Sequence, residues 1–135
     1  MNQLLAAQYA GVKDARQALF AYCRTMDNDD LNKRIPTFNE HSILSLLTHV
    51  VNAYVHWVKF FDQGIAPYYF KEADVHNMDD ADRLFEQVDT AILDFLLRHE
   101  TDIELTITRK HPVREQIITT TPLLLYTTIY NGNHP

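Results

Sequence analysis

Cysteine is nearly absent from this chain, and several other features are scarce as well. Cys23 is the only cysteine, which excludes an intrachain disulfide and zinc or redox sites of the CxxC type. Three glycines and five prolines among 135 residues argue against a turn-rich all-β fold. No stretch of 18 apolar residues occurs, and no basic segment precedes an apolar block at the N-terminus. We therefore expect no membrane span and no signal peptide, and a cytoplasmic location.

Positive charge is also sparse and scattered along the chain. The sequence has 12 Lys and Arg against 18 Asp and Glu, which gives a net charge of −6. No basic run is longer than two residues, so the electrostatic signature of nucleic-acid binding is missing. With 46% hydrophobic residues, the composition is that of a globular protein. We expect one domain over residues 1–135, without a nucleic-acid or membrane partner.

What the sequence does contain is helical periodicity. Apolar residues recur at three- and four-residue steps over residues 4–26, from residue 39 or 42 to residue 61, and over residues 79–99. The acidic run at residues 27–30 is expected to end the first helix, and Gly64 lies just past the second. Three long helices are therefore predicted.

The last third of the chain is less helical. Residues 103–108 alternate between apolar and polar side chains, which predicts a short strand or an extended segment. Thr121 before Pro122 predicts a helix start, and about nine residues follow before an Asn-Gly pair. We predict an all-α fold: an up-down four-helix bundle with crossing loops, a shortened fourth helix, and an irregular or short-strand segment before that helix.

The second predicted helix carries an unusual polar face. Ser42, Ser45, His49, Asn52 and His56 follow one another at three- and four-residue steps, so they share one side of a largely apolar helix. A neutral imidazole such as His49 is a good ligand for a divalent metal. His49 and His56 are two turns apart, roughly 10 Å, which is too far for one ion. The alternative is that His49 is a hydrogen-bonded histidine on a polar seam.

The remaining polar and aromatic candidates have simpler interpretations. We expect Cys23 to be a buried core thiol. The segment Tyr68-Tyr69-Phe70 either lines the mouth of a pocket or simply packs against the bundle. Four histidines in or beside predicted loops and helix ends are expected at the surface: His41, His76, His99 and His111.

Several segments together resemble the DinB-like superfamily, which includes YfiT-type metal-dependent hydrolases and thiol transferases. The resemblance extends from end to end of the chain. Its carriers are the opening Asn2-Gln3-Leu4-Leu5, residues 42–50 with Asn52, Tyr54 and Trp57, residues 84–89, and the Thr-Thr-Pro-Leu entry at residues 120–123.

The resemblance implies a four-helix bundle in which three histidines bind a divalent metal, zinc or nickel. His49 matches the histidine of the second helix, with Asn52, His56 and Ser45 as pocket or outer-sphere groups. The other two ligands come from the fourth helix in an HxxxH pattern. The first of them falls at or near Gly132 and the second just past Pro135, while His134 is the nearest substitute. A C-terminal truncation or frameshift fits this departure.

Three functional hypotheses follow. The first is a DinB-like protein whose metal-dependent hydrolase or thiol transferase activity on an unknown small molecule is impaired, with metal bound weakly or not at all. The second is a non-catalytic bundle that forms a homodimer through the apolar groove beside the short fourth helix. The third is a metal-independent hydrolase that uses His49 and carboxylates.

Overall fold

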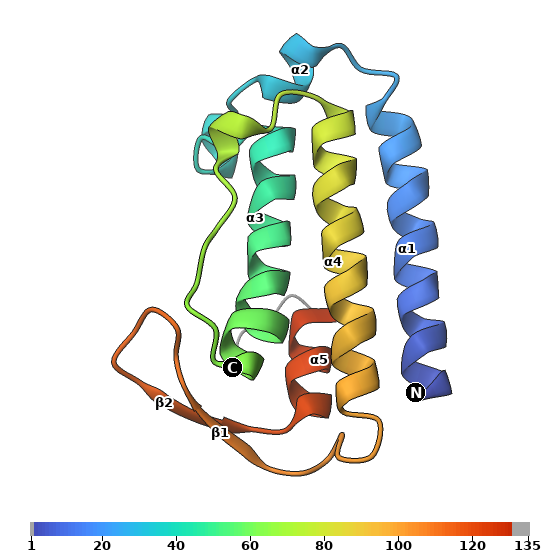
Figure 1. Cartoon of the computed structure of the whole chain (residues 1–135). Coiled ribbons are helices and arrows are strands. Elements are labelled where there is room, and N and C mark those ends of the chain that lie inside the picture. The colour runs from blue at the N-terminus through green and yellow to red at the C-terminus, as the bar shows by residue number, and fades with distance from the viewer. Residues whose placement is uncertain (1, 131–135) are drawn as a thin grey trace.

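Helices make up most of the computed structural model, which describes residues 2–130. The three long ones are α1 (Gln3–Cys23), α3 (Ile43–Val55) and α4 (Met78–Arg98), and they lie side by side in Figure 1. A further helix, α5, is described over Pro122–Tyr130 and packs at the end of the bundle where α1 begins. The predicted all-α bundle is confirmed.

Each of these four helices has a side-chain N-cap, which is supplied by Asn, Ser or Thr. Asn2 caps α1 and Asn77 caps α4, each by accepting a main-chain N–H from three residues further on. Ser42 caps α3 in the same way, within a reciprocal capping box. The predicted start of the last helix is confirmed, because the Thr121 hydroxyl accepts an N–H of its first turn and Pro122 occupies the first helical position.

The acidic run at residues 27–30 begins a short helix that the sequence analysis did not predict. α1 ends at Cys23, and the short helix α2 (Asn28–Asn32) follows after a turn. The Asp27 carboxylate caps α2 by accepting the N–H of Asp30 at 2.9 Å. The expectation that these residues end the first helix was therefore wrong, because α1 ends before them and Asp27 caps the helix that follows.

The connection between α3 and α4 crosses back over the length of the bundle. The 3-10 turn η1 (Pro36–Phe38) precedes α3, and a wider π-helical segment, η2 (His56–Phe61), continues its far end. Residues 62–77 then return along α3 through the 3-10 turn η3 (Glu72–Asp74), as Figure 1 shows. α3 and α4 therefore run parallel to each other and antiparallel to α1, with the crossing loop that the bundle prediction included.

A small hairpin replaces the single strand expected before the last helix. Strand β1 (Ile107–Lys110) pairs antiparallel with strand β2 (Ile117–Thr120). The extended segment predicted at residues 103–108 thus begins later, after turns, and has a partner that the alternation pattern did not indicate. The hairpin projects beside η2 at the lower left of Figure 1.

The core lies between α1, α3 and α4 and combines aromatic with aliphatic side chains. Cys23 is among its buried residues, as predicted. The largest side chains that are almost fully buried are Phe20, Phe60, Phe61, Phe95, Leu31, Leu44, Ile92, Leu96 and Leu125. Across the described residues, no helix combines the length and apolar character that crossing a bilayer requires.

Candidate functional site

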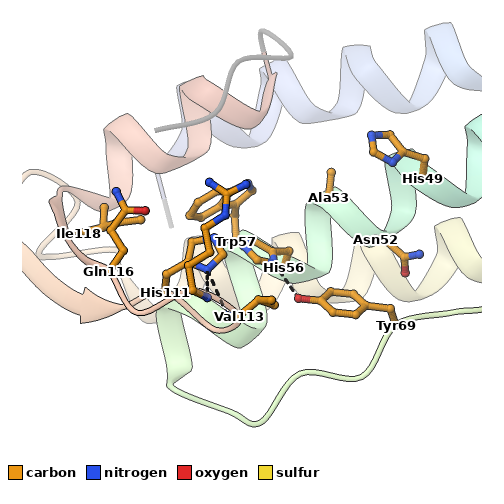
Figure 2. Close-up of a pocket in the computed structure, with 11 residues that line it drawn as sticks. His49, Asn52, Ala53, His56, Trp57, Tyr69, His111, Val113, Gln116 and Ile118 are labelled. Atoms are coloured by element: carbon orange, nitrogen blue, oxygen red, sulfur yellow. Dashed lines mark hydrogen bonds between the residues drawn. The ribbon is translucent and has the colours of Figure 1, made fainter. Parts of the chain in front are cut away.

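A pocket of about 410 Å³ opens between the far end of α3 and the hairpin. Figure 2 shows its polar side chains drawn from three parts of the chain: α3 with η2, the crossing connection, and the hairpin. Its volume lies in the range typical of sites for small molecules. The residues that line it are His49, Asn52, Ala53, His56, Trp57, Tyr69, His111, Val113, Arg114, Gln116 and Ile118.

The π-helical segment η2 presents His56 and Trp57 to the pocket. π-helical turns are rare in proteins and frequently occur at functional sites. Trp57 is 5% exposed, and its ring meets the imidazole of His111 edge to face with 5.6 Å between centroids. The widened turn at the end of α3 therefore supplies both a polar group and an apolar wall.

Asn52 holds the crossing connection against the pocket. Its side-chain Nδ2 donates to the Phe70 carbonyl at 3.0 Å, and its Oδ1 accepts the Phe70 N–H at 3.0 Å. This two-point bond to the main chain places the neighbouring Tyr69 in the pocket wall. Residues 68–70 were expected either to line a pocket or to pack against the bundle. Tyr69 agrees with the first interpretation, because it lines the pocket.

His111 enters the pocket from the turn after β1. It is 8% exposed, so the expectation of a surface histidine was wrong. Its Nδ1 accepts main-chain N–H bonds from Val113 at 3.1 Å and Arg114 at 3.0 Å. Because two donors meet the lone pair of Nδ1, the proton of the neutral ring is on Nε2.

His56 joins His111 to Tyr69 in a row of hydrogen bonds. The Nε2 atoms of the two imidazoles are 3.2 Å apart, and the Nδ1 atom of His56 is 2.7 Å from the Tyr69 hydroxyl. Since His111 carries its proton on Nε2, it donates to Nε2 of His56. His56 then carries its own proton on Nδ1 and donates to the Tyr69 oxygen.

Desolvation favours the neutral form at both ends of this row. Burial lowers the pKa of His111, and the nearby charge of Arg114 lowers it further. Burial raises the pKa of the Tyr69 phenol. Both directions agree with the proton positions that the hydrogen bonds require.

The predicted site residues of α3 separate into different roles. Asn52 and His56 make the bonds described above, and His49 lines the same pocket from an earlier turn of α3, with an exposed side chain. Ser45 lies instead in the capping box of α3, where its buried hydroxyl accepts the N–H of Ser42 at 2.9 Å. The shared helical face therefore serves both the helix start and the pocket.

The described residues do not fit a centre with three metal ligands. Among residues 2–130, no three His, Cys, Asp or Glu side chains gather closely enough to hold an ion. The lone pair of His111 is taken by main-chain N–H groups, whereas a neutral imidazole ligand must offer its lone pair to the metal. The positions near Gly132 and His134, considered for the missing ligands, lie outside the described residues.

Three further histidines among the described residues, His41, His76 and His99, lie away from the pocket wall. His76 is exposed as expected, and His41 is half-buried with its Nδ1 atom 2.9 Å from the Ser45 hydroxyl. The surface expectation for His99 was wrong, since it is 7% exposed. Its two ring nitrogens face the carboxylates of Asp62 at 3.0 Å and Asp102 at 2.9 Å. This ring joins the end of η2 to the end of α4.

The fold and the pocket define a class: a helical bundle with a histidine-lined cavity beside α3, the helix that precedes the crossing connection. A family model described as the DinB family matches residues 1–134, so the chain belongs to the DinB family. A search of curated proteins finds no match. The resemblance of residues 42–50 and 120–123 is therefore confirmed at the level of the family.

Proposed function

We propose that this chain binds a small molecule in the pocket beside α3, and that the metal-dependent hydrolase or thiol transferase activity of its lineage is impaired. Family membership supports the lineage, since DinB proteins are generally associated with metals. The donor set described above supports the impairment. A cytoplasmic location without a nucleic-acid partner remains part of the same proposal.

One observation carries this proposal: His49 lines the same cavity as His56, Tyr69 and His111. Polar groups from three parts of the chain converge there on a wall that includes the buried ring of Trp57. A few convergent polar groups in an otherwise apolar cavity are typical of sites for small molecules. His49 alone, as a single exposed imidazole, is a poor metal site, because catalytic zinc uses about three protein ligands.

Metal titration tests the proposal directly. Protein freed of metal with a chelator is titrated with Zn²⁺ and then with Ni²⁺ in a calorimeter. We expect dissociation constants weaker than about 1 µM, and a further weakening in His49→Ala. The matched control is His76→Ala, since His76 is also exposed but lies outside the pocket wall. A stoichiometric site tighter than that, lost in His49→Ala, would overturn the claim of impairment.

A second candidate is a homodimer formed through a groove between α1 and α3. The groove has a volume of about 620 Å³, and its walls include Gly11, Val12 and Tyr54. One and two turns before Tyr54 on α3, Val50 is 39% exposed and Leu46 is 37% exposed. Apolar surface of this kind favours association.

Light scattering after size exclusion tests the second candidate. We expect the apparent mass to approach twice 15.7 kDa as the protein concentration rises, and Val50→Glu to restore the single-chain mass. A single-chain mass across the whole concentration range would rule the dimer out.

A further inference from the structure

The hydrogen bonds in the pocket have a direction that is set by the main chain. The N–H groups of Val113 and Arg114 both donate to Nδ1 of His111, which places the His111 proton on Nε2. If His56 also carried a proton on Nε2, two N–H groups would face each other across 3.2 Å. His56 therefore accepts at Nε2 and donates from Nδ1.

This direction decides what the Tyr69 hydroxyl offers to a ligand. Its oxygen accepts from His56 Nδ1 at 2.7 Å, so its own hydrogen points elsewhere. Within the described part of the chain, the hydroxyl has no second hydrogen-bond partner, and Tyr69 lines the pocket. A phenol that accepts one hydrogen bond is polarised and becomes a stronger donor in the next. Tyr69 thus presents an O–H donor to an acceptor in the cavity.

The rest of the wall narrows the class of ligand. Among the described residues that line the pocket, Arg114 has the only permanently charged side chain. Trp57 and Ile118 add apolar surface on the same wall. A guanidinium and a phenol O–H together favour a carboxylate, and the indole ring favours a flat apolar body attached to it.

We propose that the pocket binds a small carboxylate attached to an apolar body, with the Tyr69 hydroxyl and Arg114 as its two anchors. His56 and His111 are positioning residues, because they act on the ligand through the direction that they impose on Tyr69. The inference rests on the proposed function only in that both place a small molecule in this pocket. It requires no metal and no residue outside 2–130.

Calorimetric titration with benzoate tests the anchors, and benzamide is the neutral analogue of the same shape. We expect benzoate to bind at least tenfold more tightly than benzamide. Tyr69→Phe should weaken benzoate about tenfold, since it removes one hydrogen bond to a charged group. Its matched control is Tyr68→Phe, because the exposed Tyr68 lies outside the pocket wall. Arg114→Gln should weaken benzoate by a similar factor, with Arg83→Gln as its control, because Arg83 is exposed and lies outside the pocket wall.

Equal affinity for benzoate and benzamide would overturn the proposal, and so would a Tyr69→Phe variant that binds benzoate as the wild type does. These outcomes are distinct from failure of the proposed function, which the zinc and nickel titration decides. A tight metal site would overturn the impairment while leaving the carboxylate test intact.

Two-bond ¹H–¹⁵N spectra of the histidine side chains measure which ring nitrogen carries the proton, and therefore the direction of the hydrogen bonds from His111 through His56 to Tyr69. At pH 7.5 we expect His111 to carry its proton on Nε2 and His56 to carry its proton on Nδ1, the less common tautomer of free histidine. A role limited to packing would leave His56 without this tautomer. Finding the His56 proton on Nε2 would overturn the proposed donor role of Tyr69.

Discussion

Two buried histidines near the far end of α3 lie in opposite electrostatic surroundings. His99 sits between the carboxylates of Asp62 and Asp102, so both of its ring nitrogens face acceptors. His111 has two main-chain N–H donors at one nitrogen and the ring of His56 at the other. The first ring therefore meets acceptors at both of its nitrogens, whereas the second meets main-chain donors at one of them.

The difference separates a structural network from a candidate binding site. Asp62 also accepts from Arg98, so the His99 network ties the end of η2 to the end of α4 through charged groups. The row of His111, His56 and Tyr69 ends instead at a cavity. The donors and acceptors around a ring, rather than its burial, distinguish the two, since both rings are less than 10% exposed.

The largest expected effect comes from breaking the His99 network at its centre. Asp62 is 4% exposed, and Asp62→Ala leaves the Arg98 guanidinium and the His99 ring without their shared partner. Removing one member of a buried ion pair costs about 3–5 kcal/mol of unfolding free energy, and we expect a loss near the lower value. Urea denaturation followed by circular dichroism measures this loss.

Asp94→Ala is the matched control for this substitution. Asp94 pairs with the same Arg98 at 2.8 Å, but its side chain is 54% exposed. Exposed pairs contribute less than about 1 kcal/mol, so Asp94→Ala should leave the urea midpoint almost unchanged. Equal losses in the two variants would show that burial does not separate these carboxylates.

A smaller loss is expected at the edge of the pocket. Asn52→Ala removes both hydrogen bonds to the main chain of Phe70, which costs about 1–3 kcal/mol when the groups are partly buried. Because Tyr69 is the neighbour of Phe70, benzoate binding should weaken in the same variant. Gln63→Ala, an exposed change in the same connection, is the control. Loss of stability without any change in benzoate affinity would mean that Asn52 does not position Tyr69.

The smallest expected effect is a pH dependence that originates at His111. Its pKa is lowered in the folded chain, so its contribution to stability is complete above about pH 6.5 and declines as the pH falls below that value. Asn at this position offers an amide oxygen to the same N–H groups without titrating. Between pH 7.5 and pH 5.5, the wild type should lose about 1 kcal/mol or less relative to His111→Asn in urea denaturation. A wild type that gains stability relative to the variant over this range would contradict the assignment of a neutral ring.

Much of the bundle could be predicted because its signals are local. The apolar spacing of residues 4–26 and 79–99 corresponds closely to α1 and α4, and Thr121 with Pro122 begins α5 as expected. The short helix α2 was missed because Asp27 was interpreted only as a stop signal. Strand β2 was missed because its residues, Ile-Ile-Thr-Thr at 117–120, do not alternate between apolar and polar side chains.

The candidate site could be predicted on one side only. The spacing of Asn52 and His56 on α3 follows from helical geometry, and both lie in the pocket wall. Their partners, Phe70 and His111, are 18 and 55 residues further along the chain, and no sequence pattern connects them. His111 appeared to be a surface residue because it lies beside a proline in an irregular segment.

The sequence by itself therefore determined the helices, their caps and the polar face of α3, because hydrogen bonds and side-chain spacing within one helix depend on near neighbours. Only the tertiary structure decided which imidazole is neutral and which faces two carboxylates. The surroundings of each ring depend on donors and acceptors that the crossing connection and the hairpin bring together. These groups are 37 and 55 residues apart in sequence, where the spacing within one helix has no influence.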